Sequence, residues 1–255
     1  MTVKTVLDKI ARGEDACVCC VGDSVTYGVI HCRPEETYTA KLAAAFAGRY
    51  RTCTVLRYDG IYHDDNGNCP LDAYDGPVLV QAGTAGCLTV VRSGVGGDTV
   101  ARLCNRADDF TVKLPGGMRP DLMTVMAGIN DALREDPHKY VTVAEYEVHY
   151  RRLLDLLHQR LPETALVLMP PSYNDHGETA QSHLEPYCDC VRRLAKEYAL
   201  PLIDVHALWM AHLIPGSAHF GQRDWLSEST YDACHPTPIG SEMTARYSFD
   251  CLHRI

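Results

Sequence analysis

The chain has 255 residues, of which 46% are hydrophobic and 22% charged, and its formal net charge is −9. This length is enough to bury a full core in one α/β domain, and we expect a single domain over residues 1–255. An acidic chain without a cluster of Lys and Arg is a poor match for phosphate or anionic lipid. We therefore expect neither nucleic acid nor a membrane as a partner.

The N-terminal segment is interrupted by charged residues from Lys4 to Asp15, so it does not resemble a secretory signal. No stretch approaches the 18 uncharged apolar residues of a membrane-spanning helix. The twelve cysteines are scattered from Cys17 to Cys251 rather than concentrated in a small disulfide framework. These features predict a cytoplasmic protein with reduced thiols.

Two of these cysteines, Cys17 and Cys20, form a C-x-x-C motif, which could serve a redox or zinc site. A second C-x-x-C pair that would complete a four-cysteine zinc site is missing. The surrounding run ACVCCVG has the apolar character of a buried strand, so we interpret these thiols as small core residues.

Short apolar runs alternate with helical patterns along the chain, which is typical of an α/β fold with a mostly parallel sheet. The predicted parallel strands are 16–21, 88–91, 122–126, 165–169 and 200–203. The predicted helices are 37–50, 99–108, 143–160, 180–198 and 238–252, the last with Thr237 as N-cap and Pro238 at its first position.

An insertion over about 53–86 does not fit the plain alternation. Two further strand-like runs, 53–57 and 78–81, flank the Gly-, Asp- and Asn-rich stretch 59–76. We predict an antiparallel hairpin added to the sheet edge, and a long disordered loop is the alternative. An exposed edge favours pairing with another chain, so we expect this hairpin to contribute to a homodimer contact rather than a lid.

Four short motifs follow predicted strands or precede the last helix. They are Gly22-Asp23-Ser24-Val25, the run from Gly94 to Thr99 (GVGGDT), Gly128-Ile129-Asn130-Asp131, and Asp232-Ala233-Cys234-His235-Pro236. Ligands of an open parallel sheet bind at the carboxyl ends of its strands. Three of the motifs fall at that edge, and the fourth can reach it from its loop.

Acyl transfer to a hydroxyl requires residues of these types. The hydroxyl of Ser24 is a weak nucleophile unless a base takes its proton, and His235 can do this near neutral pH. Asp232, three residues before His235, can hold the imidazole in the required tautomer. Backbone N–H groups of Ser24 and Gly97 and the amide of Asn130 are candidate oxyanion donors, each typically worth about 10²–10³ in rate.

Together these motifs resemble the blocks of the SGNH hydrolases, or GDSL-type esterases, a family named after such Ser, Gly, Asn and His residues. The resemblance runs from Gly22 to His235 in the family's order, although the first block reads GDSV and Arg92 and Ser93 stand where the second often begins with Asn. It implies a three-layer α/β/α flavodoxin-like fold, here with a five-stranded sheet and an edge hairpin. It also implies a Ser24–His235–Asp232 triad and an oxyanion hole of Ser24, Gly97 and Asn130. We expect no cofactor.

Each marker has an ordinary structural explanation when taken alone. Ser24 could cap a helix, and the glycines from Gly94 to Gly97 could form only a tight turn. The latter also imitate a dinucleotide loop, but Thr99 stands where the third glycine would be. The segment from His206 to His219 suggests a metal, yet no carboxylate or Cys clusters with its histidines, and we expect no metal site.

The substrate is less constrained by the sequence. Asp23, Tyr173, Trp209 and Trp225 are candidate substrate contacts, and the aromatic and polar residues of 172–225 suit a polar or sugar-bearing ester. Trp209 could equally be a core residue of a helix. We expect a small-acyl esterase acting on an acetylated carbohydrate. An acyltransferase or thioesterase using the same site, or a catalytically silent carbohydrate-binding protein, remains the alternative.

Overall fold

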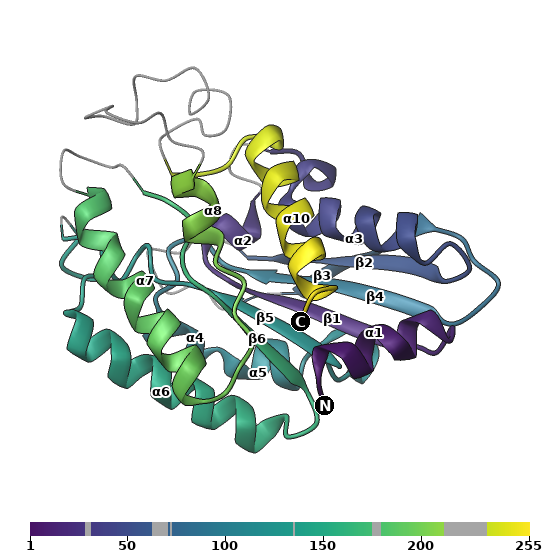
Figure 1. Ribbon diagram of the computed structural model, residues 1–255, viewed down its shortest axis with the longest axis horizontal. Helices are drawn as coiled ribbons and strands as arrows, with labels where there is room; N and C mark the ends of the chain where they lie inside the picture. The colour runs from purple at the N-terminus through teal and green to yellow at the C-terminus, as the bar shows by residue number, and fades with distance from the viewer. Residues whose placement is uncertain (29–31, 63–70, 72, 135, 175–179, 212–233) are drawn as a thin grey trace.

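The computed structural model describes residues 1–28, 32–62, 71, 73–134, 136–174, 180–211 and 234–255 (Figure 1). Its centre is a six-stranded sheet in the order β3-β2-β4-β1-β5-β6. Five strands are parallel, and β3 pairs antiparallel with β2 at one edge. The strands are β1 (Ala16–Gly22), β2 (Thr54–Ile61), β3 (Ala73–Gln81), β4 (Cys87–Gly94), β5 (Leu122–Met126) and β6 (Ala165–Met169).

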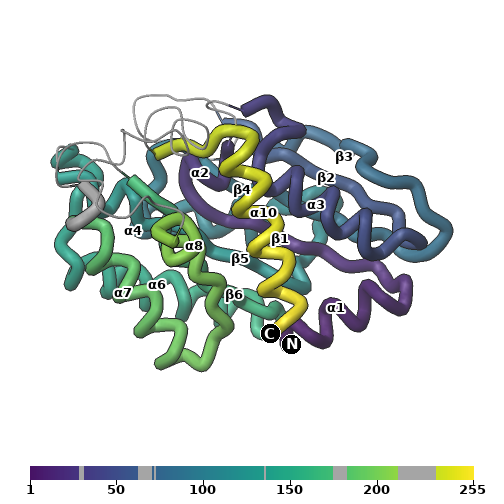
Figure 2. Tube along the Cα trace, turned by 45° about the horizontal axis from the view of Figure 1, so that its top comes forward, coloured from purple at the N-terminus to yellow at the C-terminus, as the bar shows by residue number. Residues whose placement is uncertain are grey.

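Helices cover both faces of this sheet, which confirms the predicted three-layer architecture. The helices are α1 (Val3–Ala11), α2 (Ser24–Tyr27), α3 (Tyr38–Arg49), α4 (Val100–Asn105), α5 (Ala107–Thr111), α6 (Val143–Arg160), α7 (Ala180–Glu197), α8 (Val205–Ala211) and α10 (Pro238–Leu252). Figures 1 and 2 show α3 and α10 side by side on one face. None of the described helices is long and apolar enough to cross a membrane.

The cysteines of β1 contact the helices on both faces of the sheet. Neighbouring residues of a strand point to opposite faces. Accordingly, Cys20 lies against Tyr38 of α3, whereas Cys19 faces Arg106 between α4 and α5. Every residue of β1 is buried, and burial raises the thiol pKa of Cys17 to about 12 and that of Cys20 to about 11. These thiols are core residues, as interpreted from the sequence.

The local signals for the long helices lie where the sequence predicts. α6 has the predicted bounds, and its N-cap Thr142 forms a reciprocal capping box with Glu145. α10 also has the predicted bounds, with Thr237 accepting a hydrogen bond from Gly240 N and Pro238 at the first position. The predicted helix 99–108 is interrupted instead, because the backbone of Arg106 leaves the helical conformation between α4 and α5.

The sheet differs from the prediction at both edges. The predicted strand 200–203 is reduced to a single bridge between Leu168 and Leu202. Pro201 in this segment lacks a backbone N–H and cannot donate to a ladder. At the other edge, the first arm of the predicted hairpin is β2, a full parallel member of the sheet beside β4. Only β3 is the added antiparallel strand.

Candidate active site

Three of the four motifs meet at the carboxyl edge of the sheet. In register, Gly22 at the end of β1 lies beside Gly94 of β4 and Met126 of β5. The loops after these strands therefore begin side by side, and Val95 N donates to Gly22 O at 3.2 Å across their bases. Parallel pairing alone brings the loops of Ser24, Gly97 and Asn130 together.

Ser24 is the first residue of the short helix α2. The preceding Asp23 caps this helix by accepting a hydrogen bond from Val25 N at 3.0 Å. Because Asp23 serves as the cap, the hydroxyl of Ser24 is left for other contacts. A Cβ on Gly94 would lie 2.2 Å from Tyr27 N, so α2 can sit directly on the strand ends only because this position is a glycine.

His235 reaches Ser24 from the far end of the sequence. Its Nε2 lies 2.9 Å from Ser24 Oγ, a hydrogen bond that spans 211 positions. The imidazole is half-buried, two residues before the N-cap of α10. The neighbouring Pro236 O accepts a hydrogen bond from Cys32 Sγ at 3.2 Å, which ties this turn to the segment before α3. The structure thus joins the predicted nucleophile and the predicted base directly.

The candidate oxyanion donors are connected through one residue, Asp98. Asn130 Nδ2 donates to Asp98 O at 2.9 Å, and Asp98 directly follows Gly97. Gly97 has a left-handed φ of 74°, which only glycine adopts without strain. Both carboxylate oxygens of Asp131 accept from Val100 N at 3.2 Å, a second link between the two loops.

Buried carboxylates lie beneath these loops. Burial raises the pKa of Asp23 to about 7, of Asp98 to about 6 and of Asp131 to about 8. Asp23 Oδ2 is buried without a hydrogen-bond partner among the described residues. Positive charge at His235 lowers the pKa of Asp23, and the guanidinium of Arg106 lowers that of Asp98. Burial thus disfavours the charged form of all three carboxyls, and neighbouring positive charge stabilises that form of Asp23 and Asp98.

Some of the residues around Gly97 carry no motif that would identify them in the sequence. A Cβ built on Gly97 would lie 3.4 Å from Lys139 Cε and 3.7 Å from Arg102 Nη1, so two cationic side chains converge there. Arg102 Nη1 also donates to Gly97 O at 3.1 Å. Beside them, the hydroxyl of Tyr62 lies against Gly96. These contacts join segments far apart in sequence, so no local spacing predicts them.

Two expected substrate contacts belong to the core in this structure. Tyr173 and Trp209 are both fully buried and stack with their ring centroids 6.3 Å apart, and Trp209 Nε1 donates to Thr244 Oγ1. Asp23 is only 1% exposed and acts as a helix cap. A side chain enclosed in this way has no surface to offer a substrate, so these three assignments are not kept. Asp232 and Trp225 lie outside the described residues.

The histidine considered for metal binding has protein partners instead. His206 is buried, with Nδ1 2.9 Å from Ser172 O and Nε2 2.7 Å from Glu185 Oε2. The other histidines of that segment, His212 and His219, lie outside the described residues. Within the described part of the chain, no three His, Cys, Asp or Glu side chains gather as metal ligands would.

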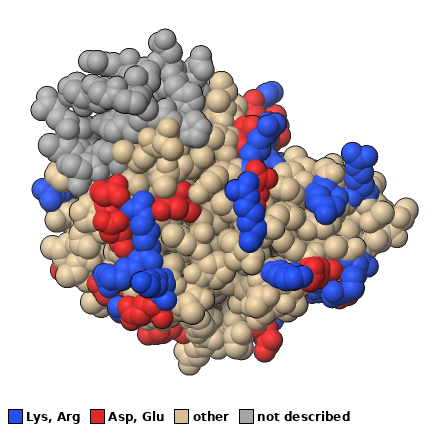
Figure 3. Space-filling model, viewed as in Figure 1, with Lys and Arg blue, Asp and Glu red and all other residues tan. Residues whose placement is uncertain are grey.

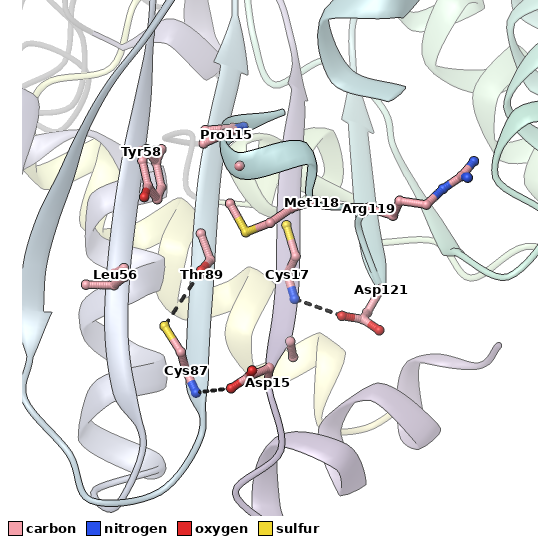
Figure 4. A pocket seen from close by; sticks show the side chains of 12 residues that line it. Asp15, Cys17, Leu56, Tyr58, Cys87, Thr89, Pro115, Met118, Arg119 and Asp121 are labelled. Atoms are coloured by element: carbon pink, nitrogen blue, oxygen red, sulfur yellow. Dashed lines mark hydrogen bonds between the residues drawn. The ribbon is translucent and has the colours of Figure 1, made fainter. Parts of the chain in front are cut away.

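A pocket of about 390 Å³ lies at the opposite, amino ends of the strands (Figure 4). Its carboxylates already hold the strand starts: Asp15 accepts from Cys87 N at 2.7 Å and Asp121 from Cys17 N at 2.8 Å. This pocket is separated from Ser24 by the length of β1. It offers no nucleophile paired with a base, so it does not compete with the carboxyl edge as a reaction site.

Surface charges of both signs are interleaved on the face shown in Figure 3. On α6 and α7, for example, Arg151 bonds to Glu147 and Glu197, and Arg193 also bonds to Glu147. Exposed pairs of this kind contribute little to stability because solvent screens them. They give this face neighbouring positive and negative groups.

Comparisons with known proteins agree with this geometry. Residues 62–243 match the model of the GDSL-like lipase/acylhydrolase family, a region that contains Gly97, Asn130 and His235 and begins after Ser24. A search of curated proteins found no match to the sequence.

Several solved structures share the fold. LAE5, an α/β hydrolase enzyme from the metagenome of Lake Arreo, Spain, has a TM-score of 0.64 at 19% identity, covering 96% of this chain and 98% of its own. Axe2, an acetylxylan esterase from Geobacillus stearothermophilus, has 0.63 at 21%, covering 94% and 95%. CEX, a two-domain esterase active on acetylated mannans, has 0.63 at 17%, covering 99% of this chain and 52% of its own.

The family match extends over most of the chain, and the structure joins Ser24 to His235 by a hydrogen bond at the carboxyl edge of the sheet. The resemblance drawn from the four motifs is thereby confirmed. The chain belongs to the GDSL-like lipase/acylhydrolase family of SGNH fold, and it is a carboxylic ester hydrolase.

Proposed function

We propose that this protein removes small acyl groups, acetyl above all, from a carbohydrate ester, with Ser24 as nucleophile and His235 as general base. The observation that carries this proposal is the 2.9 Å hydrogen bond between His235 Nε2 and Ser24 Oγ. A hydroxyl and an imidazole at this distance are what a proton transfer during nucleophilic attack requires.

The reaction follows from this contact. His235 Nε2 takes the proton of Ser24 Oγ as the oxygen attacks the ester carbonyl carbon. Gly97 N–H, Ser24 N–H and the amide of Asn130 donate to the resulting oxyanion. The tetrahedral intermediate then breaks its bond to the alcohol oxygen, which leaves with the proton from His235. Water repeats the sequence on the acyl-enzyme and releases the carboxylic acid.

The role of Asp232 in this scheme comes from its spacing to His235. For His235 Nε2 to accept a proton, Nδ1 must carry one, and a carboxylate at Nδ1 both fixes that tautomer and stabilises the imidazolium. Asp232, three residues earlier in the D-x-x-H motif, is the candidate. We expect Asp232→Asn to lower kcat strongly while the fold is retained.

The substrate class has support from the neighbours and from the site. Axe2 is an acetylxylan esterase, and CEX is active on acetylated mannans. In this chain the hydroxyl of Tyr62 lies beside Gly96, and the side chains of Lys139 and Arg102 lie beside Gly97, so aromatic and polar groups are present at this part of the oxyanion loop. Such a lining suits a hydroxyl-rich alcohol better than a long acyl chain.

The central experiment compares p-nitrophenyl esters of rising chain length with acetylated xylan and mannan oligosaccharides. We expect the highest kcat/KM on acetyl esters and a loss of about 10⁴-fold or more in Ser24→Ala. Ser248→Ala, which removes a buried hydroxyl of α10 with no described partner, is the matched control and should stay fully active. Equal activity in wild type and Ser24→Ala would exclude this mechanism.

The same assays separate the alternatives. An acyltransferase would lose ester faster when an alcohol acceptor is added, and a thioesterase would prefer acyl thioesters to oxygen esters. A catalytically silent carbohydrate-binding protein would bind oligosaccharides without turnover and without labelling of Ser24 by a fluorophosphonate.

A further inference from the structure

The side chain of Arg106 lies under the reaction centre without belonging to any of the four motifs. It stands at the break between α4 and α5, where its φ of −99° and ψ of 20° interrupt the helix, and it is only 6% exposed. Burying a guanidinium is unfavourable unless its donors are paired. Its bonding partners therefore indicate why the chain places it there.

Four of the five N–H donors of a guanidinium find acceptors here. Nε donates to Asp98 Oδ2, and Nη1 to Ser93 Oγ at 3.3 Å. Nη2 donates to Gly22 O at 3.1 Å and to Ser93 O at 3.0 Å. The ring of Phe110 lies under the guanidinium, with the Cζ atom 5.3 Å from its centroid.

Each acceptor lies next to a group that the proposed reaction uses. Gly22 O is two residues before Ser24, and Asp98 directly follows Gly97. The carbonyl of the same Asp98 holds the amide of Asn130 at 2.9 Å. One rigid planar group is thus bonded to the ends of β1 and β4 and to the loop that links both oxyanion donors.

We propose that Arg106 is a positioning residue that sets the distance between the Ser24 nucleophile and the Gly97–Asn130 oxyanion donors by binding Gly22, Ser93 and Asp98 together. This inference rests on the proposed function. Preorganised donors act only when they are in place before charge develops, and a misplacement of about 1 Å can cost 10²-fold in rate. A lysine has a single ammonium in place of the fork, so it cannot hold three acceptors in one plane.

The test uses Arg106→Lys and Arg106→Met, with Arg57→Met as the matched control. Arg57 is also 6% exposed and also pairs with an aspartate, Asp59, but it lies within β2 and, among the described residues, bonds directly to none of the loops of the site. We expect kcat on p-nitrophenyl acetate to fall about 100-fold in Arg106→Met and about tenfold in Arg106→Lys, with KM changed less than about threefold. Arg57→Met should lose stability but keep its kcat.

A double variant separates positioning from simple charge neutralisation. Arg106→Met leaves the Asp98 carboxylate buried without its cation, and Asp98→Asn removes that charge. We expect Arg106→Met/Asp98→Asn to recover most of the lost melting temperature but not kcat, because Gly22 O and Ser93 O still lack their donor. Fluorophosphonate labelling of Ser24 should slow in parallel with kcat.

Two outcomes would overturn the inference: a folded Arg106→Met with wild-type kcat, or a double variant whose kcat returns to within about threefold of wild type. Where Arg106→Met does not fold, Arg106→Lys gives the same decision. An active Ser24→Ala would instead overturn the proposed function. An inactive Ser24→Ala beside a fully active Arg106→Met would leave the esterase in place and remove only the role of Arg106.

Discussion

At the scale of one residue, the backbone conformation of Gly97 orients the N–H group that we propose as an oxyanion donor. Its φ of 74° is a left-handed backbone conformation, which residues with a side chain adopt only at a cost of roughly 1–2 kcal/mol. Two cationic side chains, Lys139 and Arg102, lie beside it.

We predict that Gly97→Ala lowers kcat at least tenfold, because relief of the strained φ would turn its N–H away from the oxyanion. Gly116→Ala is the control, since Gly116 has a φ of 64° with open space around it and lies in the loop before β5, at the other end of the sheet. Both variants should lose similar stability in urea unfolding, but only Gly97→Ala should lose turnover. Equal turnover in the two would argue against Gly97 as a donor.

Asp131 is a buried carboxyl whose raised pKa should make the stability of the protein depend on pH. Its pKa of about 8 lies above the ordinary value of 3.8, because burial and the nearby Asp23 and Asp98 disfavour its charge, and the amide of Val100 only partly offsets them. A carboxyl whose folded pKa is raised binds its proton more tightly in the folded state. Its stabilising contribution is full below about pH 4 and is lost as the pH rises toward 8.

We therefore predict that Asp131→Asn flattens this loss of stability. At pH 8 the free energy of unfolding, measured by urea denaturation, should be about 2–5 kcal/mol higher in the variant than in wild type, given about 1.4 kcal/mol per pKa unit. At pH 4 the two should differ little. Its amide oxygen can still accept from Val100 N. Asp250→Asn, an exposed carboxylate on α10, is the control. A wild-type pH slope in Asp131→Asn would show that Asp131 is ionised normally.

At the scale of elements, strand β1 both leads into the turn of Ser24 and keeps the cysteines of the C-x-x-C motif apart. All seven of its residues are buried, and it ends in the glycine that precedes the nucleophile turn. The C-x-x-C motif lies inside this strand, so Cys17 and Cys20 face opposite sides of the sheet and cannot meet.

We predict that iodoacetamide at pH 8 modifies Cys17, Cys19 and Cys20 far more slowly than the half-buried Cys87 and Cys251. The thiolate is the reactive form, and burial raises the pKa of all three β1 thiols. Burial also raises the pKa of Cys87 and Cys251, but these two side chains are partly exposed to the reagent, whereas the β1 thiols are enclosed. Peptide mass spectrometry of native and urea-unfolded protein measures the rates. Rapid native labelling of Cys17 or Cys20 would contradict the core interpretation and revive a redox role.

At the scale of the whole molecule, β3 is the last strand at one edge of the sheet that the described residues form. Val78 and Leu79 on this strand are 41% and 60% exposed. Their exposure and the terminal position of the strand in the described sheet are the features that favour pairing with another chain. The homodimer expected from the sequence remains a prediction, and this edge is where we place it.

We predict that the protein is a dimer by light scattering and that Leu79→Lys shifts it toward monomer. A charge on the paired edge opposes strand pairing. Val148→Lys, which puts the same charge on an exposed apolar position of α6, should leave the dimer intact. The activity per subunit on p-nitrophenyl acetate should stay unchanged in both. A monomeric wild-type protein would rule out this assembly.

The sequence by itself determined the class of the fold and the bounds of α6 and α10, and it singled out Ser24 and His235, which the structure joins by a hydrogen bond. These features depend on local signals, namely caps, periodicity and short motifs. The tertiary structure alone decided the rest. Four features depend on which distant segments pack together. They are the pairing of β2 with β4, the reduction of 200–203 to a bridge, the burial of Trp209 and the hydrogen bonds of Arg106. Arg106 carries no local pattern, since its acceptors on β1, β4 and the Gly97 loop become neighbours only when the sheet forms.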